Sequence, residues 1–306
     1  MADLDFERLL KSYDLGVFIN AKRLSSGFAN ENYRLETDKG VFLARLCKQQ
    51  PLENIEYELW VLKGLKSLDF PAAYPIARKD GSLISDSSAG YFVFYDFISG
   101  SEPEANIETA KEIGNASAKI GLFPNPEEKI KQNYLDWECC EQVLARIPES
   151  KNPKPDIFDF YIEQTEKLRE AYHADLPKGL VHGDIFTDNT LFNGNKLSAI
   201  IDFEEACYEN LLFEVGVAIN GFCFKENRLS SELLDSYLNE YQKIRPLSSE
   251  ELKWLPDYIK RGAHAMLTWH LQNDLVDVPN ERQESRVREL CDRINLLESD
   301  LQEIIL

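Results

Sequence analysis

The chain has 306 residues, of which 43% are hydrophobic, so it can bury one large core or two smaller ones and is not intrinsically disordered. Its formal net charge is −19 (34 Lys and Arg against 53 Asp and Glu), which argues against binding of nucleic acids or of anionic membranes. A cationic or zwitterionic small molecule is compatible with this charge, although the charge can equally serve solubility alone.

The first hundred residues favour β-structure with helices at two places. Residues 1–20 have apolar positions at helical spacing, and residues 23–46 read as two or three strands with a turn at Asp38-Lys39-Gly40. Residues 52–68 again have helical spacing. Asp80-Gly81 separates two short predicted strands, and residues 90–100 form a strongly β-favouring run. We predict a small sheet with one principal helix.

Helical patterns dominate from Pro103 onward. The exception is a predicted hairpin over residues 190–202 with a turn at Asn193-Gly194, a strong short-range hairpin signal. We therefore predict an α+β chain with a small β-rich N-lobe (residues 1–97) and a larger, mainly helical C-lobe (residues 98–306). The predicted C-lobe helices cover residues 107–121, 134–147, 156–173, 213–223, 231–243, 250–276 and 281–305.

The six cysteines form no Cys-x-x-Cys pair, and only Cys139 and Cys140 are neighbours. This spacing predicts reduced thiols rather than a zinc site or a disulfide framework. The N-terminus lacks the apolar run of a secretory signal, and no segment approaches about 18 uninterrupted apolar residues. We expect a cytoplasmic protein without a membrane or nucleic-acid partner, either a monomer or a homodimer.

The segment from Leu180 to Ala206 contains the most specific motif of the chain. It holds a His-x-Asp-x-x-x-x-Asn run (His182, Asp184, Asn189), and Asp202 follows at the end of an apolar stretch. Phosphoryl transfer from ATP needs one carboxylate near the attacking hydroxyl, and an amide oxygen and a second carboxylate for Mg²⁺. The order and spacing here are typical of kinases with the protein-kinase-like fold.

Each polar residue of this motif has an expected role. Asp184 is the candidate base that accepts the proton of the acceptor hydroxyl. Asn189 and Asp202 are the candidate Mg²⁺ ligands, because Mg²⁺ binds few protein carboxylates together with phosphate oxygens and water. His182 is expected to brace the loop more than to take part in chemistry. Candidate residues on the acceptor side are His182, Glu204, His264 and Trp269.

Candidate nucleotide-binding residues lie in the N-lobe. Arg45, on the third predicted strand, can contact the phosphates, with Glu58 on the next helix as its partner and Glu56 as the competing choice. The backbone of the loop from Ser25 to Asn30 can cover the phosphates, although a plain hairpin turn explains it equally well. We assign to the ATP site Gly27, Phe28, Asn30, Arg45, Glu58, Asp96 and Ile98.

The chain resembles the aminoglycoside phosphotransferase and choline kinase superfamily, and most closely the homoserine kinases built on that fold. The likeness rests on the sequence HGDIFTDNTLFNGNKLSAIIDFEEACYENLLFEVGVAINGFCF, on SGFANENYRLETDKGVFLARL, and on RGAHAMLTWHLQND. It implies Mg²⁺-dependent transfer from ATP to a small-molecule hydroxyl, a pocket between the lobes, and a role in threonine biosynthesis. It also implies the roles of Asp184, Asn189 and Asp202 given above.

Three alternatives remain open at this point. The acceptor can be another amino alcohol, such as choline, ethanolamine or an aminoglycoside. GTP can replace ATP. The chain can also be a non-catalytic binding protein on a kinase fold, although the complete set of Asp184, Asn189 and Asp202 argues against this.

Overall fold

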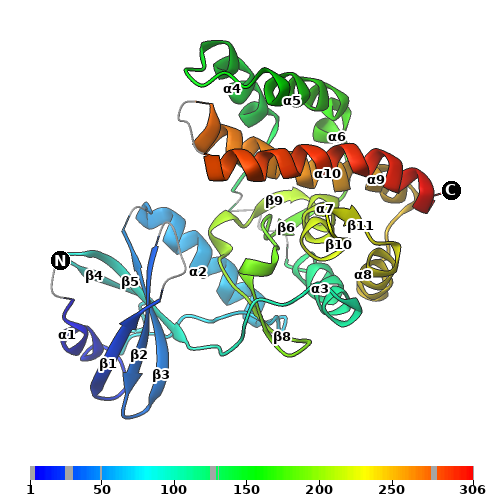
Figure 1. Cartoon of the computed structure of the whole chain (residues 1–306). Coiled ribbons are helices and arrows are strands. Elements are labelled where there is room, and N and C mark those ends of the chain that lie inside the picture. Colours follow the sequence, from blue (N-terminus) through cyan, green and yellow to red (C-terminus); the bar gives the residue numbers. More distant parts are fainter. Residues whose placement is uncertain are drawn as a thin grey trace. The chain divides into compact units, whose positions relative to one another are not determined.

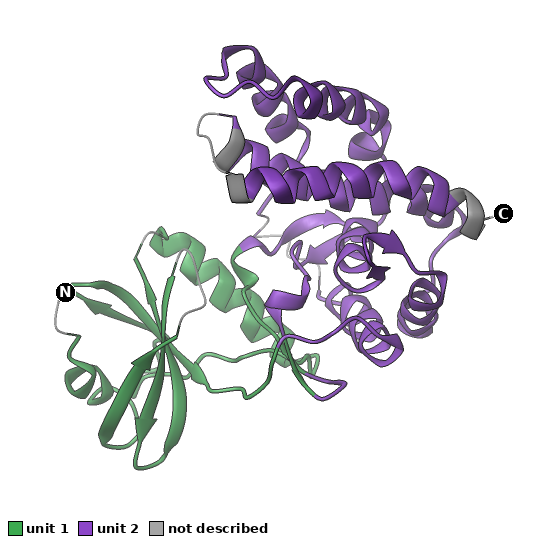
Figure 2. Cartoon of the chain, in the orientation of Figure 1, with its two compact units in different colours: residues 1–101, 191–193, 198–204 green, residues 102–190, 194–197, 205–306 purple. Residues whose placement is uncertain are grey.

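A computed structural model describes residues 4–24, 30–48, 50–124, 129, 131–276 and 281–305 of the chain. The chain divides into two compact units (Figure 2). Unit 1 comprises residues 1–101, 191–193 and 198–204, and unit 2 comprises residues 102–190, 194–197 and 205–306. The α+β class, with an N-terminal antiparallel sheet and a helical C-terminal part, is confirmed.

Unit 1 is built on a five-stranded antiparallel sheet with the strand order β1-β2-β3-β5-β4 (Figure 1). The predicted turn at residues 38–39 joins β2 to β3, whose register runs from Asn30↔Cys47 to Thr37↔Gly40. The elements are α1 (Phe6–Leu10), β1 (Phe18–Arg23), β2 (Asn30–Thr37), β3 (Gly40–Cys47), α2 (Leu52–Lys66), β4 (Ile84–Ser87) and β5 (Gly90–Asp96).

The two faces of this sheet differ in polarity: one is packed in an apolar cluster and the other carries a charged side chain. Side chains alternate between the faces of a strand, so Ala44 and Leu46 of β3 lie on the face opposite to Arg45. The first face packs against α1 in an apolar cluster that includes Phe92 and Phe94 of β5. On the second face Arg45 pairs in register with Val93 and meets α2 through its side chain. The sheet thus carries a buried cation on the face next to α2.

Two predictions for unit 1 need correction. The helix predicted within residues 1–20 is only five residues long, because Tyr13 enters the core and bonds Ser85 at 2.9 Å. Asp80-Gly81 does form a turn, but among the described residues no strand lies between α2 and this turn, so only β4 adjoins it. The preceding segment pairs with the sheet only at Pro75↔Tyr95, since proline has no N–H to extend a ladder.

Unit 2 is mainly helical, and one of its apolar clusters joins α4, α5, α9 and α10 through residues such as Val143, Tyr161, Leu267 and Leu290. The helices are α3 (Ile107–Ile120), α4 (Trp137–Arg146), α5 (Pro155–Lys167), α6 (Arg169–His173), α7 (Leu211–Phe222), α8 (Ser231–Ile244), α9 (Ser249–His270) and α10 (Glu281–Ile305). Short helical turns cover Ile147–Glu149, Thr187–Asn189, Phe203–Glu205 and Leu271–Leu275. The predicted helices are therefore confirmed, although the one over 156–173 is divided at Leu168.

The helices α7 and α9 approach each other closely. A Cβ atom at Gly216 of α7 would lie 2.1 Å from the carbonyl oxygen of Tyr258, and one at Gly262 of α9 would lie 2.8 Å from Gly216. Because real Cβ contacts are never so short, only glycine fits at these positions. The pair of glycines fixes how near α9 comes to the helix that follows the candidate catalytic segment.

The candidate catalytic segment, from Leu180 to Ala206, contains or adjoins two short pairs of strands. The predicted hairpin is confirmed as β7 (Thr190–Asn193) and β8 (Lys196–Ile200), with Gly194 at φ +61°. An antiparallel ribbon of β6 (Lys178–Val181) and β9 (Cys207–Asn210), absent from the sequence prediction, flanks it on both sides in sequence. A further small pair, β10 (Phe224–Lys225) with β11 (Arg228–Leu229), follows α7.

All six cysteines are free thiols, and five of them are buried, as predicted. In the part of the chain that the structure describes, no helix is both long and apolar enough to cross a membrane. Within the same residues, no group of three or more His, Cys, Asp or Glu side chains is arranged to hold a metal ion.

Candidate active site

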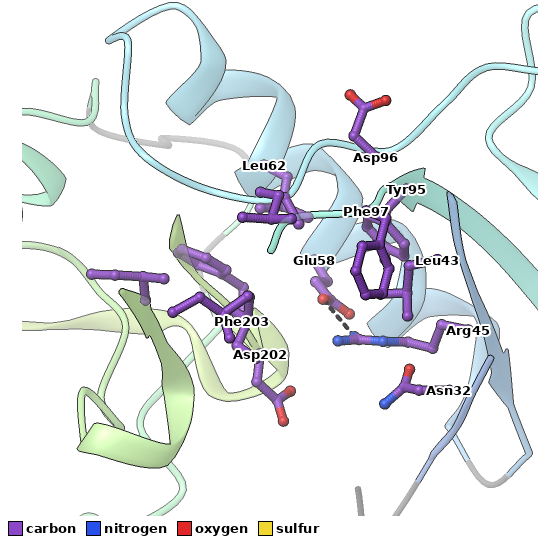
Figure 3. A pocket seen from close by; sticks show the side chains of 15 residues that line it. Asn32, Leu43, Arg45, Glu58, Leu62, Tyr95, Asp96, Phe97, Asp202 and Phe203 are labelled. Carbon is purple, nitrogen blue, oxygen red and sulfur yellow. Dashed lines mark hydrogen bonds and ion pairs between the residues drawn. The ribbon is translucent and has the colours of Figure 1, made fainter. Parts of the chain in front are cut away.

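A pocket opens in unit 1 on the sheet face that carries Arg45 (Figure 3). Apolar side chains such as Leu43, Leu62 and Ile200 form part of its wall, and its polar groups include Asn32, Arg45, Glu58 and Asp202. Apolar walls with a few convergent polar groups are typical of small-molecule sites. Asp96 and Ile98 also line this pocket. The side chain of Asp96 points away from Arg45 and is exposed (Figure 3).

Arg45 forms a buried ion pair with Glu58. Its Nη1 atom lies 2.9 Å from Glu58 Oε1, and the two side chains are 9% and 3% exposed. Glu58 is therefore the partner, rather than Glu56. Burial opposes the charge of Arg45, but Glu58, Tyr95, Asp202 and Glu204 together raise its pKa well above the usual value. The guanidinium therefore stays charged although it is desolvated.

Glu204 lies with the predicted nucleotide-binding residues. It accepts a hydrogen bond from Asn30 Nδ2, and its Oε1 atom is 3.6 Å from Arg45 Nη1. We predicted Glu204 on the acceptor side, whereas the structure brings it together with Asn30 and Arg45 in unit 1. Gly27 and Phe28, the other two loop residues assigned to the nucleotide, lie outside the described residues.

Asp184 and Asn189 of unit 2 are in direct contact. The Nδ2 atom of Asn189 donates to the Asp184 carbonyl oxygen at 2.9 Å and to Asp184 Oδ2 at 2.7 Å. A tight turn through Gly183, whose φ is +80°, carries the chain from β6 into this pair. Because both bonds use the Nδ2 atom of Asn189, its Oδ1 atom is not engaged by Asp184. An amide oxygen therefore lies near the candidate base without being bonded to it.

Glu214 binds the backbone of this turn, and the sequence analysis assigned it no role. It is 1% exposed, and its Oε2 atom accepts a hydrogen bond from the Gly183 N–H at 2.8 Å. Burial raises the pKa of Glu214 to about 7, although the backbone N–H groups of Gly183 and His182 oppose the rise. The available signal was that Glu214 is the one charged residue in the mainly apolar sequence of α7.

The predicted histidines have different surroundings within unit 2. His182 is fully buried, and its Nδ1 atom lies 3.3 Å from the Asp184 N–H that donates to it. His264 is also fully buried, and its two ring nitrogens bond Thr165 Oγ1 and Tyr172 OH, each at 2.9 Å. Burial, followed by Arg261, lowers the pKa of His264 to about 3. Both ring nitrogens of His264 are thus engaged by the protein, while Trp269 is partly exposed.

Tyr134 is a further residue near the candidate base that sequence reasoning missed. It is 38% exposed, so only partial desolvation raises its pKa, and the carboxylates of Glu205 and Asp184 raise it further. Lys131 lies 3.7 Å from Glu205, so this side of unit 2 contains both signs of charge. The segment reaches this place because Gln132 and Tyr208 of β9 form a parallel bridge. No sequence pattern marks a pairing of this kind.

Asp202 belongs to unit 1, unlike Asp184 and Asn189. It adopts a left-handed conformation with φ +67°, which is uncommon for a residue other than glycine. Residues held in such conformations cluster at functional sites. Its carboxylate is one of the polar groups of the pocket and one of the negative charges that act on Arg45 (Figure 3).

Comparison with known sequences identifies related proteins along most of the chain. The sequence model of the phosphotransferase enzyme family matches residues 20–247. The homoserine kinase of Rhodospirillum rubrum is 29% identical over 269 residues, which cover 86% of this chain and 83% of that protein. The homoserine kinase of Neisseria meningitidis serogroup B is 27% identical and covers 86% of both chains.

Comparison with solved structures identifies the same fold. A microcompartment-associated aminopropanol kinase superimposes with a TM-score of 0.75 at 18% identity and covers 97% of both chains. A spectinomycin phosphotransferase in complex with ADP and spectinomycin gives a TM-score of 0.69 at 16% identity, again over 97% of both chains. The predicted fold class is thereby confirmed along almost the whole length.

Proposed function

Because this chain belongs to the phosphotransferase enzyme family and is an ATP-dependent small-molecule phosphotransferase, we propose that its acceptor is homoserine and its product O-phosphohomoserine. The choice of acceptor is supported by the relatives from Rhodospirillum rubrum and Neisseria meningitidis, both named homoserine kinase. The proposed place of the reaction in threonine biosynthesis rests on the same likeness.

The contact between Asp184 and Asn189 is the observation that carries the proposed chemistry. In the proposed reaction the hydroxyl oxygen of the acceptor forms a bond to the γ-phosphorus, while the bond from this phosphorus to the bridging oxygen of ADP breaks. Asp184 takes the proton of the hydroxyl. Asn189 holds the carboxylate in place through Nδ2, at 2.7 Å from Oδ2. Positioning of this kind is the main contribution that a protein makes to phosphoryl transfer.

The amide oxygen of Asn189 and the carboxylate of Asp202 suit the oxygen-ligand preference of Mg²⁺. Bound there, the ion would neutralise charge on the phosphates of ATP. Asn189 offers its Oδ1 atom because Nδ2 is engaged by Asp184. We propose these two residues as the metal ligands.

We propose that ATP binds in the pocket of unit 1. Arg45, held by Glu58 at 2.9 Å, is the proposed phosphate contact. The backbone at Asp96 and Ile98, which line the pocket, is the proposed contact for adenine. The proposed division of labour assigns nucleotide binding to the N-lobe (residues 1–97) and acceptor binding to the C-lobe (residues 98–306).

The surroundings of Asp184 support an acceptor with an amino group. The carboxylate of Glu205 and the ring of Tyr134 are both groups that attract an ammonium ion, and both act in the neighbourhood of Asp184. Lys131, 3.7 Å from Glu205, adds a cation that suits the carboxylate of a hydroxy amino acid. Homoserine carries both of these charges.

The proposal is tested by measuring ADP release with homoserine, choline, ethanolamine and kanamycin, and by identifying the product by mass. We expect homoserine to give the highest kcat/KM. Asp184→Asn is expected to lower kcat by about 10²-fold to 10⁴-fold, the usual contribution of a general base. Asp188→Asn, in the same loop, serves as the matched control and is expected to retain activity.

Two results would contradict separate parts of the proposal. A higher kcat/KM for choline, ethanolamine or kanamycin would replace homoserine as the acceptor while leaving the chemistry intact. Full activity of Asp184→Asn on a working acceptor would show that Asp184 is not the base.

A further inference from the structure

The guanidinium of Arg45 is surrounded by more negative charge than it can balance. Glu58, Asp202 and Glu204 all act on its pKa, so that three carboxylates face one cation and the formal local charge is −2. This excess lies where we propose that the phosphates bind. An anionic ligand entering such a site meets net repulsion, unless a carboxylate leaves or a cation enters with the ligand.

The carboxylates of Glu58 and Glu204 are held in different ways. Glu58 is a residue of the helix α2, bonds Arg45 at 2.9 Å and is 3% exposed. Glu204 lies in a short turn, is 3.6 Å from the same Nη1 atom and is 16% exposed. The ion pair of Arg45 with Glu204 is thus longer than the one with Glu58, and Glu204 is the more exposed carboxylate, so the ion pair with Glu204 is the weaker of the two.

The carboxylate of Glu204 contacts two donors at once. One and the same oxygen, Oε1, accepts the Asn30 Nδ2 hydrogen bond and faces Arg45 Nη1. Both of these donors belong to residues that we assign to the nucleotide. In addition, the Nε atom of Arg45 is buried and has no hydrogen-bond partner among the described residues. A buried cation with an unused donor, next to a carboxylate whose ion pair with it is as long as 3.6 Å, indicates a place for a second anion.

We propose that Glu204 is an internal competitor of the nucleotide phosphates for Arg45 and Asn30. The inference rests on the proposed nucleotide site and describes its regulation. Without a nucleotide the Glu204 carboxylate takes the place of a phosphate oxygen. Binding of the nucleotide expels it, and the expelled carboxylate increases the negative charge near Asp202. A divalent cation relieves this charge, so Glu204 makes nucleotide binding depend on the cation.

The test measures the dissociation constant of ADP by calorimetry, with and without Mg²⁺, for the full-length protein and for Glu204→Gln. Without Mg²⁺ the variant is expected to bind ADP about threefold to tenfold more tightly, the order of effect of one partly exposed charge. With saturating Mg²⁺ the difference is expected to fall below about twofold. Glu36→Gln is the matched control. It removes an equal charge from β2, but Glu36 pairs with Val41, four residues along β3 from Arg45, so the dissociation constant of ADP should not change with or without Mg²⁺.

A second variant, Glu204→Asp, distinguishes competition with the nucleotide from a purely structural role of Glu204. Glu204→Asp keeps the charge but shortens the side chain, so it should tighten binding of ADP alone less than Glu204→Gln does. A bracing role for Glu204 would weaken ADP binding in both variants, with and without Mg²⁺, and would overturn the proposal. Equal affinity of wild-type protein and Glu204→Gln for ADP alone would overturn it as well.

The result also separates this inference from the proposed function. If wild-type protein binds Mg²⁺-ADP but Glu204→Gln binds ADP alone no more tightly, only the role of Glu204 is wrong. If wild-type protein binds no ADP under either condition, the proposed nucleotide site is wrong, and the competition falls with it.

Discussion

At the scale of single residues, the site depends on charges that are buried together with their partners. Arg45 is buried against Glu58, and Glu214 is buried beneath the turn that carries Asp184. The two cases differ in one respect. Arg45 has an opposite charge beside it, whereas Glu214 accepts its bonds from backbone N–H groups. A carboxylate without a cation keeps its proton more easily, because burial disfavours its charged form.

Glu214 should therefore make stability depend on pH. Its pKa is raised from 4.5 to about 7 in the folded protein, so below 4.5 both folded and unfolded states are protonated and no pH-dependent difference arises. As the pH rises from 4.5 to about 7, the unfolded state ionises first and the folded state loses stability relative to Glu214→Gln. Above pH 7 this loss stays constant. Its size is at most about 4 kcal/mol, since the pKa rises by about 2.5 and each pKa unit is worth about 1.4 kcal/mol.

Urea unfolding of both proteins at several pH values from 4.5 to 8 measures this difference. Glu138→Gln replaces an exposed glutamate of α4 and serves as the control, for which we expect no such trend. A gap between wild type and Glu214→Gln that stays constant over this range would contradict the raised pKa.

At the scale of elements, local sequence predicts contacts between residues that are close along the chain. Asp184 and Asn189 are five residues apart, and Arg45 and Glu58 are thirteen apart, so strand and helix periodicity bring the helix to Arg45 but leave Glu58 and Glu56 as competing partners. Asn30 and Glu204 are 174 residues apart, and their contact depends on how a turn after β8 is placed against β2. Likewise β6 and β9 are four-residue strands without a joining turn, which leaves no local signal of their pairing.

The contact of α7 with α9 provides a test at this scale. Gly216→Ala would place a Cβ atom 2.1 Å from a backbone oxygen of Tyr258, so the helices must separate. We expect the free energy of unfolding to fall by about 2–4 kcal/mol, as for other overpacked cores. Lys253→Ala, at an exposed position of α9, is the control and should change it by less than about 0.5 kcal/mol. A tolerated Gly216→Ala, measured by urea unfolding, would contradict this close packing.

At the scale of the whole molecule, the charge of −19 opposes the approach of an anionic substrate. The local cation Arg45 is buried, so it acts on a nucleotide only at short range. Long-range repulsion between exposed charges is screened by salt, with a Debye length of about 10 Å at 0.1 M. The acidic surface is thus a kinetic property of the molecule, separate from the affinity that the pocket provides.

The rate constant for association of ADP should consequently rise with ionic strength. We expect an increase of about twofold to fivefold between about 10 and 150 mM KCl at fixed free Mg²⁺, because screening weakens the repulsion. Stopped-flow measurements can follow this, with uncharged adenosine as the control ligand that should be insensitive to salt. A rate constant that falls as KCl increases would show that local positive charge, rather than net charge, controls the encounter.

Unit 1 takes part of its structure from late in the chain, and this has a consequence for how such proteins can be recombined. Residues 198–204 bring Ile200 to a bridge with Ala72 and the ring of Phe203 to 6.1 Å from that of Phe70. A gene fusion with a single crossover after residue 101 would join the sheet of one parent to the covering segment of another. Exchange of unit 1 between relatives therefore requires two replacements made together. One covers residues 1–101, and the other covers the segment around residues 191–204, which follows the candidate base.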